Sequence, residues 1–215
     1  MKKLLLVLAV VLFANVARAE GVGFHFGPKI GYQAANLSYD KADIQTGFAE
    51  HLTAGIFGRL CIHNVLIQPE LLWFKSGQVF ALKGASLSEL DPRIEMNQQN
   101  LAVPIFVGYQ FLDLKLLKLR AHVGPVMYFV VDQTNKCNYE NQELKLEANG
   151  MTWGGAVGVG VDIFLFTLDI NYSFGLTNLI DKSDVNIGGQ DFKIDNTKQS
   201  LFTVTLGVKL VSLGM

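Results

Sequence analysis

Long hydrophobic runs are scarce in this chain of 215 residues, although half of its residues are hydrophobic. The longest run lies near the start of the chain, where the ten residues 4–13 are all apolar, whereas a helix that crosses a bilayer needs about 20. Beyond that run, no stretch approaches 18 uninterrupted apolar residues. This pattern excludes a helical membrane protein, so the apolar residues must be distributed over many short elements.

Cysteine is rare and an excess of positive charge is absent. Two cysteines, Cys61 and Cys137, are too few for a disulfide scaffold, and their spacing matches no zinc pattern. The 18 basic residues are balanced by 19 acidic ones. Proteins that bind nucleic acid usually carry an excess of basic residues, and this chain has none. We therefore expect no nucleic-acid partner.

The first residues are typical of a secretory signal peptide. Lys2 and Lys3 precede the apolar run, and Ala17 and Ala19 supply the small residues that signal peptidase recognises. We therefore expect a signal peptide over residues 1–19 and one mature domain over residues 20–215. Without Lys2, Lys3 and Arg18 the mature chain has 15 basic and 19 acidic residues, a net charge of −4.

The mature sequence has the period of two that is typical of β-strands. In one stretch Ile67, Leu71 and Trp73 share a face, while Gln68 and Glu70 share the other. We expect each strand to have one wholly apolar face and one face of polar residues or glycine. The eight predicted strands cover residues 23–34, 50–61, 65–76, 98–110, 116–131, 151–165, 167–177 and 199–211.

Alternation by itself also fits a soluble β-sandwich or a lipocalin-like barrel. The connections decide between these folds, because they alternate between long and short along the whole chain. In a meander this places all long loops at one end, as in transmembrane barrels with external loops and periplasmic turns. We therefore predict an all-β fold, an eight-stranded antiparallel up-and-down transmembrane β-barrel. The opposite rims also keep Cys61 and Cys137 too far apart for a disulfide.

The polar face of each strand would then line the lumen. Residues expected inside are Lys29, Phe57, Arg59, Glu70, Arg120, His122, Asp169 and Lys209, with Asp162 as a further candidate, and we expect Glu70 to compensate Arg59 or Arg120. Nine glycines, at positions 27, 31, 55, 124, 154, 158, 160, 175 and 207, are expected to make room for them. Aromatic residues expected in the interfacial girdles are Phe24, Tyr32, Trp73, Phe74, Tyr109, Phe129, Trp153, Tyr172 and Phe202.

Several segments carry a family resemblance. "IQPELLWFKSG" (67–77), "NLAVPIFVGYQF" (100–111), "AHVGPVMYFVV" (121–131) and "LDINYSFGLTNL" (168–179) resemble the small outer-membrane β-barrel or porin-family domain, a relative of the OmpX and OmpA barrels. The resemblance implies an outer-membrane barrel in a Gram-negative envelope, and most members have no assigned biochemical activity. The chain departs from the family in having Asn171 where a basic residue is common, and in having no aromatic residue after Phe202.

Candidate catalytic residues are few. A lipid-modifying barrel enzyme needs a serine with a nearby histidine and an orienting polar residue. We interpret His122 as a hydrogen-bonding residue of the lumen; His51 could meet Ser38 or Ser86 at the external rim. The acidic loop 181–196 lacks the ligand spacing of an EF-hand, and "GGAVGVG" (154–160) lacks the Lys-Ser/Thr of a phosphate loop. We therefore assign no catalytic, cofactor or metal residue.

The sequence thus favours a monomeric outer-membrane protein with a structural or surface-interaction role and no enzymatic activity. Its expected partners are the outer-membrane lipid and lipopolysaccharide, together with an extracellular ligand or host surface at the loops. Two alternatives remain open at this point: a barrel enzyme acting on lipid A or peptides, and a narrow pore for small solutes.

Overall fold

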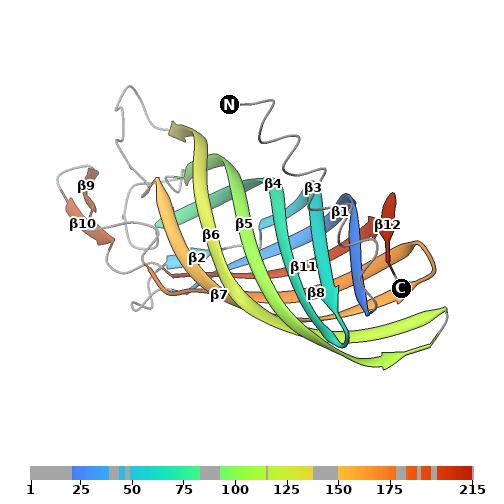
Figure 1. The fold of residues 1–215 in the computed structure, drawn as a ribbon. Helices are drawn as coiled ribbons and strands as arrows, with labels where there is room; N and C mark the ends of the chain where they lie inside the picture. Colours follow the sequence, from blue (N-terminus) through green and yellow to red (C-terminus); the bar gives the residue numbers. More distant parts are fainter. Residues whose placement is uncertain are drawn as a thin grey trace, which may run out of the picture.

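The computed structural model describes residues 21–38, 44–46, 49–82, 93–114, 116–137, 150–177, 183–187, 190–194 and 198–214. The expected signal peptide therefore lies outside the described residues. Eight long antiparallel strands form a closed barrel (Figure 1). They are β1 (Val22–Ser38), β3 (Ala49–Ile62), β4 (Val65–Leu82), β5 (Arg93–Asp113), β6 (Leu117–Cys137), β7 (Met151–Ile163), β8 (Phe166–Gly175) and β11 (Lys198–Val208).

Each strand pairs with its neighbours in sequence, and β1 pairs with β11 from Lys29↔Gly207 to Ser38↔Lys198 to close the barrel. The predicted fold class is confirmed. After a break at residues 209–210, the short strand β12 (Val211–Leu213) continues along β1 through Phe24, His25 and Phe26. Among the described residues, no helix is long and apolar enough to cross a membrane.

The turns and loops sort to opposite ends, as predicted. Two-residue turns at 63–64 and 164–165 and the short connection between β5 and β6 lie at one end, which the sequence analysis expects on the periplasmic side. The connection after β7 is thus 164–165, where the sequence had suggested residue 166. His63 and Phe164 have positive φ angles of 53° and 52°, which is the geometry that so short a turn between twisted strands requires.

At the loop end the strands are longer and more numerous than the sequence predicted. β5 and β6 each have 21 residues, and β2 (Ile44–Thr46) pairs with β4. Within the predicted acidic loop, β9 (Ser183–Ile187) and β10 (Gln190–Ile194) form a separate hairpin, at the end of the molecule away from β12 (Figure 1). Since about 9–11 residues are enough to cross a bilayer, β5 and β6 extend beyond the hydrocarbon.

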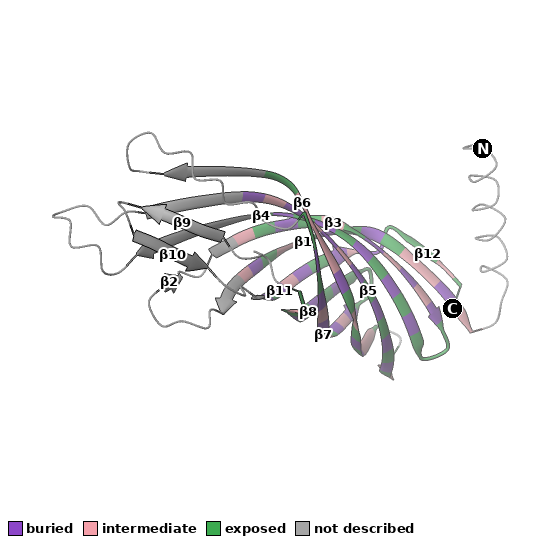
Figure 2. Cartoon of the chain, turned by 90° about the vertical axis from the view of Figure 1, so that its left-hand side faces the viewer, coloured by how far each residue is buried: buried purple, intermediate pink, exposed green. Residues whose placement is uncertain are grey.

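Burial alternates residue by residue along the strands (Figure 2). In β8 every second residue from Thr167 to Ser173 is buried and the intervening residues are exposed. The exposed set is apolar, so the hydrophobic face points outward to lipid and the buried set fills the lumen. Of the aromatic residues expected in the girdles, Phe74 is the exception, because it is 2% exposed and lies inside.

Some inner glycines have a different role from the one expected. A Cβ atom on Gly27 would lie 1.7 Å from the carbonyl oxygen of Val208, and one on Gly55 would lie 2.0 Å from that of Leu71. These glycines allow the backbones of neighbouring strands to approach each other in the strongly coiled wall. Gly158 and Gly160, in contrast, do face long inner side chains.

The contact at Gly27 gives a testable prediction. Gly27→Ala should lower the free energy of unfolding in detergent by about 1–3 kcal/mol, because its methyl group would overlap the backbone of the closing strand. Gly58→Ala is the matched control, since a Cβ there meets only Pro69 Cγ at 4.0 Å. Urea titrations followed by tryptophan fluorescence would measure both, and equal midpoints for the two variants would contradict this account of the closure.

Candidate functional site

The polar interior of the barrel is the candidate site. Its ionised side chains, here called the lumenal charge network, are each less than 8% exposed. They are Lys29, Arg59, Glu70, Arg120, Asp162, Asp169 and Lys209; the sequence placed all of them inside except Asp162, which was a further candidate. The network contains four cations and three carboxylates, so its net charge is +1.

Six strands contribute to a closed ring of contacts. Lys29 Nζ on β1 lies 2.5 Å from Glu70 Oε1 on β4 and also pairs with Asp169 on β8. Asp169 pairs with Arg120 on β6, and Arg120 pairs in turn with Asp162 on β7.

Two further contacts close the ring. Arg59 Nη1 on β3 donates to Asp162 Oδ2 at 2.6 Å, and Arg59 Nε donates to Gln68 Oε1 at 2.5 Å. Gln68 Nε2 then donates to Glu70 Oε1 at 2.5 Å. Continuity around the ring means that each carboxylate faces at least one cation from another strand.

Neutral residues complete the network. Thr167 Oγ1 accepts hydrogen bonds from both arginines, at 3.0 Å from Arg59 and 2.6 Å from Arg120. The ring of Phe57 lies 5.0 Å from Lys29 Nζ and 5.4 Å from Arg59 Cζ, so both cations contact its face. The sequence placed Phe57 inside, but it gave no sign that Gln68 and Thr167 bridge the charged groups.

The expected partner of Glu70 was wrong. Glu70 pairs with Lys29, whereas Arg59 and Arg120 are compensated by Asp162 and Asp169. The alternation of side chains along a strand predicts which face a residue occupies. Its ion-pair partner depends in addition on how far neighbouring strands are staggered. Asp162, only a candidate on sequence grounds, is the most connected carboxylate, because Lys209 Nζ also lies 3.5 Å from it.

His122 has the role that the sequence suggested. Its Nε2 lies 2.6 Å from Asn171 Oδ1, and its ring packs against Phe106 with centroids 4.5 Å apart. Asn171, the departure from the family pattern, is therefore the neutral partner of a buried histidine. A Cβ at Gly158 would lie 2.0 Å from that same Asn171 oxygen, so this glycine does make room for the pair.

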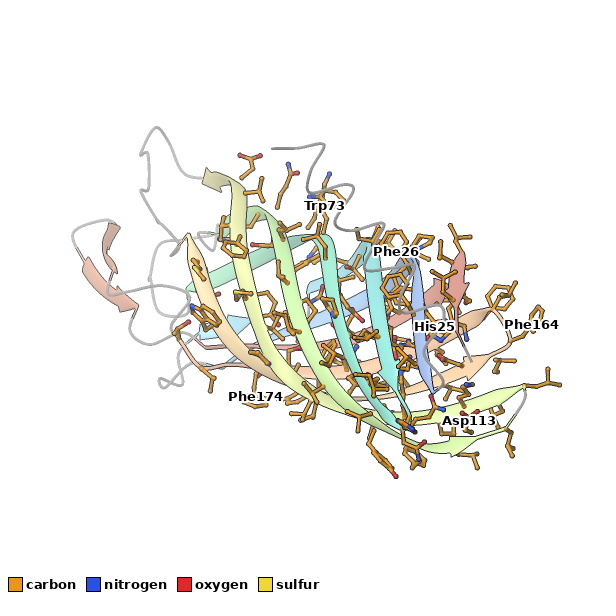
Figure 3. The ribbon with its side chains drawn as sticks, in the orientation of Figure 1. His25, Phe26, Trp73, Asp113, Phe164 and Phe174 are labelled. Atoms are coloured by element: carbon orange, nitrogen blue, oxygen red, sulfur yellow. The ribbon has the colours of Figure 1, made fainter. Side chains whose placement is uncertain are left out.

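The other candidate residues do not assemble into a catalytic group in the described part of the chain. His25 Nδ1 lies 3.0 Å from Ser212 Oγ at the periplasmic rim, in a contact that the sequence did not suggest. Figure 3 shows His25 near the end that carries Asp113 and Phe164, with Phe26 and Trp73 on the outer surface. The side chains of Ser38, Ser86 and loop 181–196 lie outside the described residues, while residues 154–160 belong to β7.

The lumen differs from expectation at its loop end, where part of the inner face is apolar and lies beside buried polar residues such as Gln33, Ser173 and Thr203. Seven buried residues, here called the apolar cluster, form it: Leu72, Phe74, Ala102, Phe106, Val126, Ala156 and Leu201. Tyr128 packs against them, edge to face with Phe74. The expectation that every inner face is polar or glycine is therefore wrong for this half of the barrel.

Comparison with known proteins agrees with this geometry. The family model described as "Outer membrane protein beta-barrel domain" matches residues 13–181. The chain belongs to this outer-membrane β-barrel family. It is accordingly a protein of the outer membrane. No curated protein matches the sequence.

Solved structures with a similar fold share little sequence. OprG from Pseudomonas aeruginosa is 12% identical, with a TM-score of 0.54 over 91% of this chain and 97% of that one. Outer membrane protein W from E. coli is 16% identical, with a TM-score of 0.43 over 90% of this chain and 100% of that one. Ail from Yersinia pestis, solved with the heparin analogue sucrose octasulfate, is 12% identical, with a TM-score of 0.43 over 89% and 100%. At these identities the likeness concerns the fold alone.

Cys61 also agrees with the predicted topology. It is a free, buried cysteine at the end of β3 beside the 63–64 turn. Cys137 ends β6 at the opposite rim.

The charge network predicts that similar substitutions at three carboxylates lower the free energy of unfolding by different amounts. Asp162→Asn should lower the free energy of unfolding by about 3–5 kcal/mol, because it leaves buried Arg59 without its carboxylate. Asp113→Asn is the control: its ion pair with Lys118, at 3.2 Å, is partly exposed, and we expect a loss of about 0–1 kcal/mol. Glu70→Gln should lower the free energy of unfolding by an intermediate amount, because Lys29 still pairs with Asp169 in that variant. Equal unfolding midpoints for all three would mean that the lumen is hydrated enough to solvate these charges.

Proposed function

We propose that this protein is a closed, non-enzymatic barrel of the outer membrane whose lumen is a structural core and whose loop end carries its interactions. The observation that supports this most directly is the ring of ion pairs across the lumen. Side chains from six of the eight strands meet there, and each is almost completely buried. A solute could pass only if several of these pairs separated.

The number of strands supports the same proposal. Eight strands enclose a space that side chains fill, whereas open porins have 16 to 18. The inner glycines could have widened the bore, but the space beside them is occupied. A Cβ at Gly160 would lie 2.4 Å from both Arg120 Cζ and Asp169 Oδ1. Gly160 therefore accommodates the network, which supports a closed lumen.

The alternative function, a barrel enzyme that acts on lipid A or peptides, has less support. Ser212 and His25 are the described pair that most resembles a nucleophile and its base. In the described part of the chain, no carboxylate hydrogen-bonds to His25, so nothing there orients the ring as a third catalytic residue would. His122 is buried against Phe106 and bonded to Asn171, out of reach of a lipid or peptide substrate.

Two further features support a monomer that acts at its loop end. Pairing of β1 with β11 leaves no free edge in the wall, so the barrel needs no second copy to satisfy its backbone. The apolar outer face contacts lipid. Strands β4, β5 and β6 extend past the membrane on the loop side, and they carry the longer connections toward lipopolysaccharide and the cell surface.

Reconstitution in planar bilayers tests the closed lumen. The folded protein should give no stable single-channel conductance, because the charge network blocks the bore. A double variant, Arg59→Ser with Arg120→Ser, should conduct if it folds, while Lys118→Ser outside the ring should stay silent. Uniform, reproducible conductance steps with the wild-type protein would overturn the proposal.

An activity assay tests the absence of catalysis. Protein in micelles should release no product from labelled lipid A or from labelled peptides. If turnover were observed and were lost in both Ser212→Ala and His25→Ala while Ser173→Ala retained it, the rim pair would be catalytic and the proposal wrong. Turnover unchanged in these two variants and also in His51→Ala would indicate a contaminating enzyme, whereas its loss in His51→Ala would likewise overturn the proposal.

A further inference from the structure

Apolar side chains occupy the connections on one side of the turn end of the barrel. They are Leu114 and Leu116 between β5 and β6, Phe164 and Leu165 between β7 and β8, and Leu210 between β11 and β12, here called the apolar rim. Their exposed fractions run from 42% at Leu165 to 70% at Leu210. Lys115, between the first two leucines, lies outside the described residues.

The three connections of the apolar rim lie side by side. The backbone N–H of Phe164 donates to the carbonyl of Leu116 at 3.1 Å, and that of Lys209, next to Leu210, donates to the carbonyl of Leu165 at 2.8 Å. Figure 3 shows Phe164 at the turn end of the barrel. Single exposed apolar residues are common on any protein, but a contiguous group of them marks a surface that contacts lipid or another molecule.

The opposite side of the turn end is polar. His63 and Asn64 connect β3 with β4, four strands around the barrel from β7 and β8, and both are exposed. Asn64 Nδ2 donates to Tyr109 Oη at 3.3 Å. His63 and Phe164 are the first residues of their two-residue turns, with φ angles of 53° and 52°. Two turns of the same shape but opposite polarity indicate that the two sides of this end have different surroundings.

Strand length places the apolar rim at the edge of the bilayer core. A strand tilted by about 40° advances roughly 2.5 Å per residue along the membrane normal, so a hydrocarbon band of about 25 Å takes about ten residues. Trp153 on β7 is exposed and is an aromatic residue expected at the loop-side boundary of that band. The tenth residue after it is Ile163, so Phe164 and Leu165 follow directly at the other boundary.

We propose that the apolar rim is a lipid-binding surface that inserts among the phospholipid acyl chains of the leaflet at the turn end. The barrel is tilted, so that this side lies deeper and the side of His63 and Asn64 meets water.

Continuity with the lipid-facing wall identifies phospholipid as the partner. Ile163 and Phe166, on either side of the turn, are 57% and 52% exposed on the outer face of the barrel. A protein-binding patch is usually bounded by polar residues, whereas this rim continues the apolar face without a polar border at that turn. The nearby charge of Lys209 is directed inward, 3.5 Å from Asp162.

Tryptophan at the two matched turn positions tests the depth of each side. The background is Trp73→Phe with Trp153→Phe, which removes both native tryptophans. Phe164→Trp and His63→Trp are then compared in nanodiscs of phosphatidylcholine with brominated acyl chains, where aqueous iodide reaches both membrane faces. Phe164→Trp should emit at the shorter wavelength and be quenched more by bromine than by iodide. His63→Trp, the control, should be quenched more by iodide.

The unsubstituted chain provides a second measurement that needs no tryptophan variant to fold. In nanodiscs that contain a lipid with a nitroxide on its acyl chain, the amide NMR signals of Leu116 and Leu165 should lose more intensity than those of His63 and Asn64. Equal losses at the two turns would overturn the proposal.

The quenching pattern also separates other occupants of the rim from lipid. Stronger quenching of Phe164→Trp by iodide than by bromine would mean that the rim is open to water and free for a protein partner. Protection from both quenchers would mean that a second copy of the chain covers it. Either result, or equal bromine quenching of the two variants, would overturn the proposal.

Discussion

The ring of buried ion pairs is the interaction on which the barrel depends. Each member lies on a different strand from its charged partners, and Lys29 and Asp169 are 140 positions apart in the chain. Arg120 can meet Asp162 and Asp169 within the neighbouring strands β6, β7 and β8, but Lys29 and Arg59 reach Asp169 and Asp162 only when the wall has closed. A buried ion pair often adds little net stability compared with apolar packing, but one that is broken leaves a charge without a partner. The network therefore penalises incomplete or misaligned closure more strongly than it stabilises the correct one.

This penalty makes the strand register specific. Because side chains alternate between faces, a slip of one residue in β8 would turn Asp169 toward lipid and bring an apolar residue inside. A slip of two residues keeps the faces but moves Asp169 away from Lys29 and Arg120. Apolar residues inside a barrel would tolerate the second error, whereas directional contacts at 2.5–3.0 Å do not. We infer that the charged half sets the stagger between strands, and that the apolar cluster packs onto a wall already aligned.

Much of the fold can be predicted from the sequence because the period of two is imposed by the bilayer. Every strand that crosses it must present apolar residues to lipid, so the inward position of Arg59, Arg120 and Lys209 follows from parity alone. The ion-pair partners cannot be predicted from parity, because Glu70 could reach Lys29 or Arg59 depending on the stagger between neighbouring strands. The ends of β5 and β6 were missed because the lipid constraint stops at the membrane surface. The apolar cluster was missed because a filled lumen accepts Leu72 and Phe74 as readily as polar residues.

The two halves of the lumen have different chemical consequences although they solve the same problem of filling a narrow bore. In the charged half, each carboxylate of the ring faces at least one cation from another strand. Toward the loop end the apolar cluster fills part of the bore, beside polar residues such as Asn171, which hydrogen-bonds to His122. Glu70 lies between these two parts, and its Oε1 accepts hydrogen bonds from Lys29 and Gln68 of the ring. Because Glu70, Leu72 and Phe74 share one face of β4, the register that pairs Glu70 with Lys29 also places these two members of the apolar cluster inside the barrel.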